Sequence, residues 1–456
     1  MNQPVIELVF DAFAGLPLWI QVFFWVVLAI VITTFISSIG LFFLTIGART
    51  RIRQLRRAAQ SSGCAESNFL WVFVVPALNE AVTIRDSVSR LQQTSATHAL
   101  FLVIDDASDD GTGTILAGIE DDRIRVLRRE LPNARVGKAA ALNDAYRYLR
   151  ETVLTDPAMQ HWGDGNTILC VVDADGRLSF DAPLHVAAHF HDPRVGGVQS
   201  LVHIYNQRTP LTWAQNVEFG SFGRLFQLGR TWWGTANMGG NGQFNRLAAL
   251  VAVSDEEGPW RPRLTEDQDL GVRLLQAGWR GHQENRAVIS QQGLNSLRKL
   301  YKQRVRWAQG GWQCLPLIRS TGSIRASVSG RIDAAYYLLL PMLQLINGTG
   351  FLLSILVAVF TSHGFLAYSP WIILFFLGLG LGPGILAQLT QSKRWYWIIP
   401  NLILVIPYTL YSWIIFPVVS AALLRNLMGI TSWKKTGRET SDGRMAGETE
   451  SATLTG

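Results

Sequence analysis

Residues 168–176 decide the fold, and they read Ile168-Leu169-Cys170-Val171-Val172-Asp173-Ala174-Asp175-Gly176. Five apolar residues predict a buried strand, and the polar residues after them predict a loop at its carboxyl end. Similar runs occupy residues 69–75, 101–104 and 195–201, with helical patterns between them, for example at 81–91 and 137–149. This alternation predicts an α/β domain over residues 69–290, with a mostly parallel sheet covered by helices on both faces. Ligands bind such sheets at the carboxyl ends of the strands, so the acidic residues there are candidates for a site.

Apolar residues concentrate at the two ends of the chain. Only 16% of the 456 residues are charged, against about 25% in soluble proteins. Residues 17–47 are almost continuously apolar and long enough for one tilted membrane helix. We expect residues 1–16 to lie at the membrane interface and residues 48–68 to form a basic linker. Positive charge stays inside, so we expect a multi-pass protein of the plasma (inner) membrane with its α/β domain in the cytoplasm.

A second apolar region, residues 331–424, contains about three candidate membrane segments. One crossing followed by three would place the tail, residues 425–456, outside, whereas its basic residues, beginning with Arg425, favour an inside tail. One segment could therefore be interfacial or re-entrant, and the number of crossings stays open. The prolines that could break such a segment are Pro400, Pro407 and Pro417. We expect the polar tail to be disordered.

The formal net charge of +7 does not indicate a nucleic-acid partner. Several basic residues sit beside apolar runs, which is typical of contact with anionic membrane lipids. The three cysteines have no metal-ligand spacing and are expected to be unpaired thiols.

Three acidic motifs follow predicted strands. Glu80 and Asp106 are placed to accept hydrogen bonds from a base N–H or a ribose hydroxyl. Asp173 and Asp175 form an Asp-x-Asp pair, and carboxylate oxygens are the ligands that Mg²⁺ or Mn²⁺ prefers beside a diphosphate. Each motif taken alone is also typical of an ordinary polar turn.

Two further motifs lie downstream. Thr265-Glu266-Asp267 offers a carboxylate that could remove a proton from an attacking hydroxyl, although it also suits a helix start. Gln303-x-x-Arg306-Trp307 offers an arginine for a diphosphate and a flat ring for a sugar. The same residues would suit a basic interfacial helix, which we expect within residues 291–330.

In this order, the motifs Asp106, Asp173-x-Asp175, Thr265-Glu266-Asp267 and Gln303-x-x-Arg306-Trp307 resemble family 2 glycosyltransferases of the processive polysaccharide synthase type. Cellulose, chitin and hyaluronan synthases belong to that group. The resemblance covers roughly residues 69–315. It implies an α/β fold, a GT-A-like doubly wound cytoplasmic domain inserted between α-helical transmembrane segments. It further implies inverting transfer of a hexose from a nucleotide-sugar, UDP-glucose or UDP-N-acetylglucosamine, to a growing β-linked polysaccharide that is secreted as it grows.

The resemblance also implies a role for each matching residue and Mg²⁺ or Mn²⁺ as cofactor. Asp267 would be the catalytic base, and Asp175 and Asp173 would hold the metal. The residues expected to bind the nucleotide are Glu80, Asp106, Lys138 and Asp173. The residues expected to bind the substrate are Gln303, Arg306, Trp307, Glu266, Gly240 and Asn241. Trp232 and Trp233 are expected either to stack on the growing chain or to pack against other elements.

Three alternatives remain open from the sequence. Relatives with larger pores carry more membrane segments, which leaves room for a homo-oligomer or for a short or lipid-linked product. Ceramide glucosyltransferase is similar too, including its Gln-x-x-Arg-Trp element, and adds a single sugar to a lipid acceptor. The remaining alternative is a transporter or receptor that senses a nucleotide without catalysis.

Overall fold

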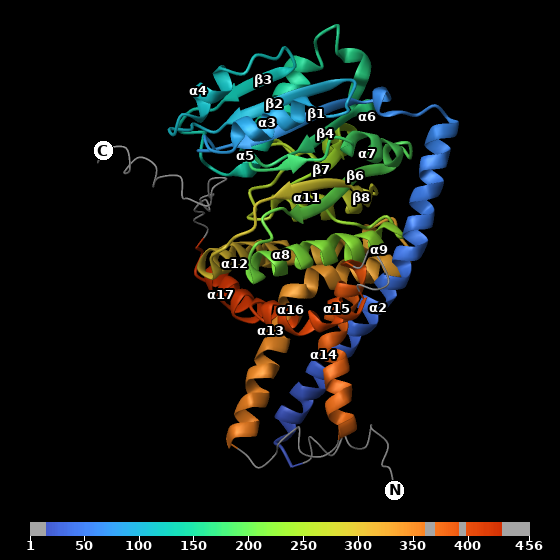
Figure 1. Cartoon of the computed structure of the whole chain (residues 1–456), viewed down its shortest axis with the longest axis vertical. Coiled ribbons are helices and arrows are strands. Elements are labelled where there is room, and N and C mark those ends of the chain that lie inside the picture. The colour runs from blue at the N-terminus through green and yellow to red at the C-terminus, as the bar shows by residue number, and fades with distance from the viewer. Residues whose placement is uncertain (1–14, 361–369, 392–397, 431–456) are drawn as a thin grey trace, which may run out of the picture.

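One mixed sheet organises the domain in the computed structural model, which describes residues 15–360, 370–391 and 398–430 (Figure 1). Within these residues eight strands pair in the order β3-β2-β1-β4-β7-β6-β8-β5. Their bounds are β1 Leu70–Ala77, β2 Ala99–Asp105, β3 Ile124–Arg128, β4 Thr167–Val171, β5 Arg177–Leu178, β6 Val195–Ile204, β7 Gln243–Arg246 and β8 Arg280–Gln291. The expectations for residues 1–16 and 425–456 fall largely outside the described residues.

The sheet is mixed, and its parallel pairings include β6 with β8 in its second half. Strands β3, β2, β1 and β4 run parallel, whereas β7 is antiparallel to both β4 and β6. The prediction of a mostly parallel sheet is confirmed for four of the seven pairings of the described strands, and the antiparallel β7 is the feature that it lacked. The sequence did not predict β7 because only Phe244 of its four residues is apolar, which leaves no hydrophobic pattern of a strand.

Helices cover both faces of the sheet because the residues of β1 alternate between two cores. Trp71 and Phe73 face a core with α3 (Ile84–Gln92), α4 (Thr112–Ala117) and α7 (Ala182–Phe190). Val72 and Val74 face a core built with α5 (Lys138–Tyr148), α10 (Leu247–Val253) and α11 (Glu266–Gln276). Because the strands are buried on both faces, they hold the acidic motifs at their carboxyl ends in fixed positions.

Three long apolar helices run together away from the sheet: α2 (Leu18–Ser61), α13 (Val328–Phe360) and α14 (Pro370–Gln391) (Figure 1). The helix α2 continues through most of the expected linker at residues 48–68. Helix-forming Arg, Gln, Leu and Ala residues dominate there, and Ala48 and Ile52 pack against Leu228. The basic segment is therefore mainly a rigid extension of the membrane helix.

A second group of apolar helices lies across the base of the domain (Figure 1). It consists of α15 (Ile398–Ile403), α16 (Val405–Ser412) and α17 (Ile415–Leu427), beside α8 (Pro210–Ser221) and α12 (Leu297–Cys314). Three helical stretches of the described residues are long and apolar enough to cross a membrane, namely Leu18–Ser61, Val328–Val357 and Ile399–Leu427. The chain is therefore a membrane protein.

The remaining helices are short. They are α6 (Gly163–Asn166), α9 (Leu228–Thr231), the 3₁₀ turns Glu66–Asn68, Gln160–Trp162 and Leu315–Ser323, and the π-helical turns Leu149–Val153 and Phe222–Gln227.

Candidate active site

A pocket of about 1440 Å³ opens at the carboxyl ends of β1, β2 and β4. It brings together every residue that the sequence predicts for the site, from strands, loops and helices far apart in the chain. These residues are Glu80, Asp106, Lys138, Asp173, Asp175, Gly240, Asn241, Glu266, Asp267, Gln303, Arg306 and Trp307. Their positions agree with a single site, and the individual roles stay predictions.

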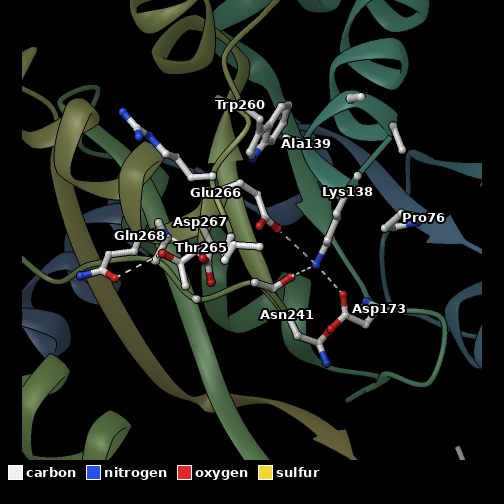
Figure 2. A pocket seen from close by; sticks show the side chains of 18 of the residues that line it. Pro76, Lys138, Ala139, Asp173, Asn241, Trp260, Thr265, Glu266, Asp267 and Gln268 are labelled. Atoms are coloured by element: carbon white, nitrogen blue, oxygen red, sulfur yellow. Dashed lines mark hydrogen bonds and ion pairs between the residues drawn. The ribbon is translucent and has the colours of Figure 1, made fainter. Parts of the chain in front are cut away.

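Lys138 lies at the centre of the pocket (Figure 2). It begins α5 directly after Gly137, whose φ of 131° suits glycine. Its Nζ donates to Asp173 Oδ1 at 2.5 Å and to the Gly240 carbonyl at 2.8 Å, and lies 3.8 Å from Glu266 Oε1. Burial opposes its charge, but Asp173 and Glu266 more than compensate and raise the pKa of Lys138. The pocket thus holds a permanent positive charge among carboxylates.

Glu266 and Asp267 start α11 at the wall of the pocket (Figure 2). Burial raises the pKa of Glu266 to about 7, with Lys138 opposing the shift. Burial also raises the pKa of Asp267, although Lys138 and the backbone N–H of Gln268, which donates to Asp267 Oδ1 at 2.9 Å, act against it. A carboxylate whose basicity is raised in this way is well suited to accept a proton from a hydroxyl.

Gly240 lets the backbone approach this carboxylate. A Cβ at position 240 would stand 3.2 Å from Asp267 Oδ2 and 3.4 Å from Lys138 Nζ. Any side chain here would crowd both groups, so glycine keeps the space beside Asp267 open.

The Asp-x-Asp loop after β4 is held by Asn241. The N–H of Asp173 donates to Asn241 Oδ1 at 3.0 Å, and Asn241 Nδ2 donates to Gln291 Oε1 at 3.0 Å. Asn241, predicted to bind substrate, therefore also supports the loop. Asp175 is buried at the pocket wall.

The donor set of this loop fits a divalent cation. No group of three or more His, Cys, Asp or Glu residues in the described ranges is arranged to hold a metal. Two carboxylates on a strand-end loop still suit Mg²⁺ or Mn²⁺, because such ions take their remaining oxygens from diphosphate and water. Asp173 and Asp175 are the residues that would hold the ion.

The edge of the pocket that is expected to bind the nucleotide contains a charge pair that the sequence did not reveal. Asp106 accepts from the buried guanidinium of Arg129 and from the N–H of Arg135 at 3.0 Å. Arg129 also donates to Asp144 Oδ2 at 2.6 Å. Glu80 accepts from Thr83 Oγ1 at 2.9 Å. Arg129 directly follows β3, a strand that no apolar run in the sequence predicts, so its strand-end position gave no signal.

Helix α12 carries Gln303, Arg306 and Trp307 into the pocket, and the buried Arg304 contacts the first and the last of them. Arg304 donates to Glu218 Oε2 at 2.6 Å and to Gln303 Oε1 at 2.8 Å. Its guanidinium lies 4.1 Å from the centre of the Trp307 ring. Arg304 and Glu218 were not among the predicted site residues, because an ion pair between α8 and α12 leaves no local pattern.

Tyr337 brings the first helix of the carboxyl-terminal apolar region into the pocket wall. Next to it, Arg230 Nε donates to Asp333 Oδ2 at 2.6 Å, and the Arg230 guanidinium lies 4.8 Å from the Tyr337 ring. Tyr337 lies inside an apolar run, which by itself predicts only part of a membrane segment. Trp232 and Trp233, in contrast, do not line this pocket; Trp232 packs on Gly47 of α2.

Two family models match the chain. The model described as Glycosyl transferase family 2 matches residues 72–249, and the model described as Glycosyl transferase family group 2 matches residues 168–383. Together they contain the Asp-x-Asp loop, α11 and α12. The chain belongs to glycosyltransferase family 2. The match to an enzyme family favours catalysis over the alternative of a transporter or receptor that only senses a nucleotide.

The fold agrees with this family. A mannosyltransferase from Pyrobaculum calidifontis, solved in complex with GDP-Man and Mn²⁺, matches the family 2 chain with a TM-score of 0.52 and 17% identity. The match covers 86% of this chain and 99% of that one. The predicted GT-A-like α/β domain between apolar helices is thereby confirmed.

Sequence relatives of this family 2 chain differ in their acceptors. A β-monoglucosyldiacylglycerol synthase from Trichormus variabilis is 34% identical over 215 residues, which is 46% of this chain and 42% of the relative. A poly-β-1,6-N-acetyl-D-glucosamine synthase from Staphylococcus aureus is 28% identical over 246 residues, 53% of this chain and 55% of the relative. The chain thus spans about half the length of the curated relatives it matches.

Proposed function

We propose that this family 2 glycosyltransferase moves a hexose from a nucleotide-sugar, UDP-glucose or UDP-N-acetylglucosamine, to a growing β-linked polysaccharide with inversion at the anomeric carbon. One observation carries the proposal. A single pocket holds the Asp-x-Asp loop, Lys138, two carboxylates with raised pKa and the Gln-x-x-Arg-Trp face of α12. Inverting transfer requires such a combination of a base, cationic groups for the diphosphate and a surface for the acceptor.

In the proposed mechanism Asp267 accepts the proton of the acceptor hydroxyl as that oxygen attacks the anomeric carbon. The bond from this carbon to the diphosphate oxygen breaks, and the nucleoside diphosphate leaves. Arg306 and Lys138 are the cations that offset its charge. Glu80 and Asp106 bind the nucleoside, and Trp307 presents its ring to the acceptor sugar.

Asp173 and Asp175 would hold Mg²⁺ or Mn²⁺ in this proposal. When bound, the ion would supply positive charge for the departing diphosphate. The Pyrobaculum mannosyltransferase was solved with Mn²⁺, which supports this assignment by likeness of fold. The catalytic side faces the cytoplasm, where nucleotide-sugars are available, and a homo-oligomer would give a polymer a wider passage between the helices.

A lipid acceptor is the second candidate. Tyr337 extends the pocket wall to the first carboxyl-terminal apolar helix, so a lipid hydroxyl could reach the site from the membrane side. The diacylglycerol-linked product named for the Trichormus relative supports it. In this alternative one sugar is added, and no polymer forms.

The test is to supply membranes that contain the full chain with labelled nucleotide-sugars and to measure product size. A ladder or high polymer supports the polysaccharide synthase, and a single glycolipid supports the lipid acceptor. No labelled product with any donor would contradict both. A chelator in excess should abolish transfer and added Mg²⁺ or Mn²⁺ should restore it; transfer that persists in chelator removes the ion from the proposal.

A further inference from the structure

A second pocket lies on the membrane side of the domain, away from the active site. It has a volume of about 450 Å³ and is lined by Arg51, Trp232, Trp233, Arg280, Arg325, Ala326 and Ser327. The residues come from α2, from the turn after α9, from the start of β8 and from the segment before α13. We propose that this pocket binds the phosphate headgroup of an anionic phospholipid. The proposal is independent of the sugar and acceptor used at the active site.

The positive charge of the pocket is only partly neutralised. Arg280 pairs with Asp192 at 3.1 Å. Among the described residues no acidic side chain lies within ion-pair distance of Arg51 or Arg325, and the Arg51 guanidinium donates to the Trp232 carbonyl at 2.7 Å. Three guanidinium groups facing one carboxylate leave an excess of donors, which a phosphate with its several acceptor oxygens would satisfy.

Glycines shape the walls of this pocket. A Cβ at Gly278 would stand 3.0 Å from Arg325 Cδ, and one at Gly234 would stand 3.0 Å from Arg280 Cγ. Both glycines have positive φ, 92° and 74°. The backbone therefore lies directly under the two arginine stems, which limits the directions that the guanidinium groups can take. The stems of Arg280 and Arg325 are thus packed on the backbone at the edge of the pocket.

The pocket lies at the height expected for lipid headgroups. On α2, Phe43 and Ile46 are 62% and 59% exposed just before Arg51. On α13, Val328 and Ile332 are 68% and 64% exposed just after Arg325. At the end of the apolar part of α2 and directly before α13, exposed apolar side chains thus give way to arginine, the order of groups met on leaving the hydrocarbon region. Figure 1 shows α9 beside α2 on the side from which the apolar helices leave the domain.

The tryptophans favour a lipid over a soluble phosphate. Trp232 is 42% exposed and Trp233 packs against the start of α13, where a Cβ at Gly330 would stand 3.1 Å from it. Exposed tryptophan beside arginine is typical of the membrane–water interface, where the ring contacts acyl chains and the cation contacts phosphate. A free anion would use the arginines but leave this apolar wall exposed.

The experiment measures lipid retention by the purified full chain in a neutral detergent, with native mass spectrometry. Phosphatidylglycerol and phosphatidylcholine are added in equal amounts. We expect one phosphatidylglycerol to bind more tightly than phosphatidylcholine, and Arg51→Gln with Arg325→Gln to weaken it by about five-fold per arginine. The matched control is Arg53→Gln with Arg57→Gln, which removes the same charge from exposed positions of α2 and should change retention less than about two-fold, the effect of unspecific charge.

Three outcomes would overturn the proposal. Equal loss in the control pair would mean unspecific attraction to the basic helix. Equal retention of both lipids by the unaltered protein would mean that the pocket does not recognise the net negative charge of the headgroup. Displacement of phosphatidylglycerol by millimolar inorganic phosphate would identify a soluble anion as the ligand. Should the double variant unfold, the exposed Arg325→Gln alone carries the test, with Arg53→Gln as its control.

Discussion

Asp267 faces the pocket, whereas the nearby carboxylate of Asp269 does not. Asp269, two residues on, is buried and paired with Arg273 at 2.5 Å, away from the pocket. Asp267 lines the pocket, and its Oδ1 accepts the backbone N–H of Gln268. Of the carboxylates in the first turn of α11, Asp269 therefore has a structural role, while Asp267 and Glu266 are available for chemistry.

We expect Asp267→Asn to lower kcat by about 10²- to 10⁴-fold, because the amide cannot accept the proton of the acceptor hydroxyl. The variant keeps the shape of the side chain, so the thermal unfolding transition should stay close to that of the unaltered protein. Sugar transfer from a labelled nucleotide-sugar measures the effect. Asp122→Asn, at an exposed surface position, is the control. Full activity of the Asp267→Asn variant would show that another group is the base.

The rate should fall at acidic pH earlier than for an ordinary aspartate. Asp267 must be ionised to accept a proton, and burial raises its pKa, so falling pH protonates it and removes activity already above the usual aspartate range. A profile of kcat/KM against pH measures this acid limb. Glu266, with a pKa of about 7, titrates nearby. The limb should therefore persist in Glu266→Gln; its disappearance would assign the base to Glu266.

At the scale of elements, α12 and the start of α11 form one unit. Gly310 of α12 packs on Thr265, where an added Cβ would overlap Thr265 Oγ1. Gln313 of α12 accepts from the Leu264 N–H at 3.1 Å. The helix that carries Arg306 and Trp307 thereby sets the position of the turn that carries Asp267.

This packing predicts that Gly310→Ala separates the two elements. The methyl group has no space, so α12 or the turn must shift, and a misplacement of about 1 Å can cost about 10²-fold in rate. We expect a fall in kcat with a smaller change in nucleotide affinity, measured by kinetics and by binding of the nucleoside diphosphate. Gly322→Ala, where an added Cβ meets nothing within 4 Å, should be neutral. Equal effects of the two substitutions would contradict the coupling.

At the scale of the whole molecule, α16 packs against α8 and α17 packs against α12. Tyr411 donates to Glu218 at 2.6 Å, Trp312 donates to the Val419 carbonyl at 3.2 Å, and Gln309 donates to the Ile430 carbonyl at 2.6 Å. A bilayer core is about 30 Å thick, and a stretch that contacts α8 and α12 at Tyr411, Val419 and Ile430 is not expected to cross it. Their outer face is apolar, with Leu410 and Leu427 exposed, as in an interfacial helix.

We therefore predict that α2, α13 and α14 cross the membrane while the stretch Ile399–Leu427 lies at its surface, although its length and composition alone would allow a crossing. Three crossings place the amino terminus outside and the carboxyl terminus on the cytoplasmic side. With a tag at each end, protease added to intact cells should remove only the amino-terminal tag. Permeabilised cells, in which both tags are cleaved, are the control. Loss of the carboxyl-terminal tag from intact cells would show that a further segment crosses.

The sequence by itself determined the features that local patterns encode. Buried strands such as β1 and β4 follow from continuous apolar runs, and the loop residues Asp106, Asp173 and Asp175 follow from their place at strand ends. The two apolar regions follow from composition. Each of these features depends on residues close together in the chain, because the spacing of apolar side chains along a helix or strand repeats within a few positions.

Only the tertiary structure decided which distant residues meet. The Lys138 contact with Asp173, the Arg304 pair with Glu218, the place of Tyr337 in the pocket wall and the three arginines beside Trp232 each join segments far apart in the chain. The antiparallel β7 and the packing of α17 against α12 were decided in the same way. The physical reason is that such contacts are selected by packing and charge pairing of the whole fold, which leave no periodic signal in any one segment.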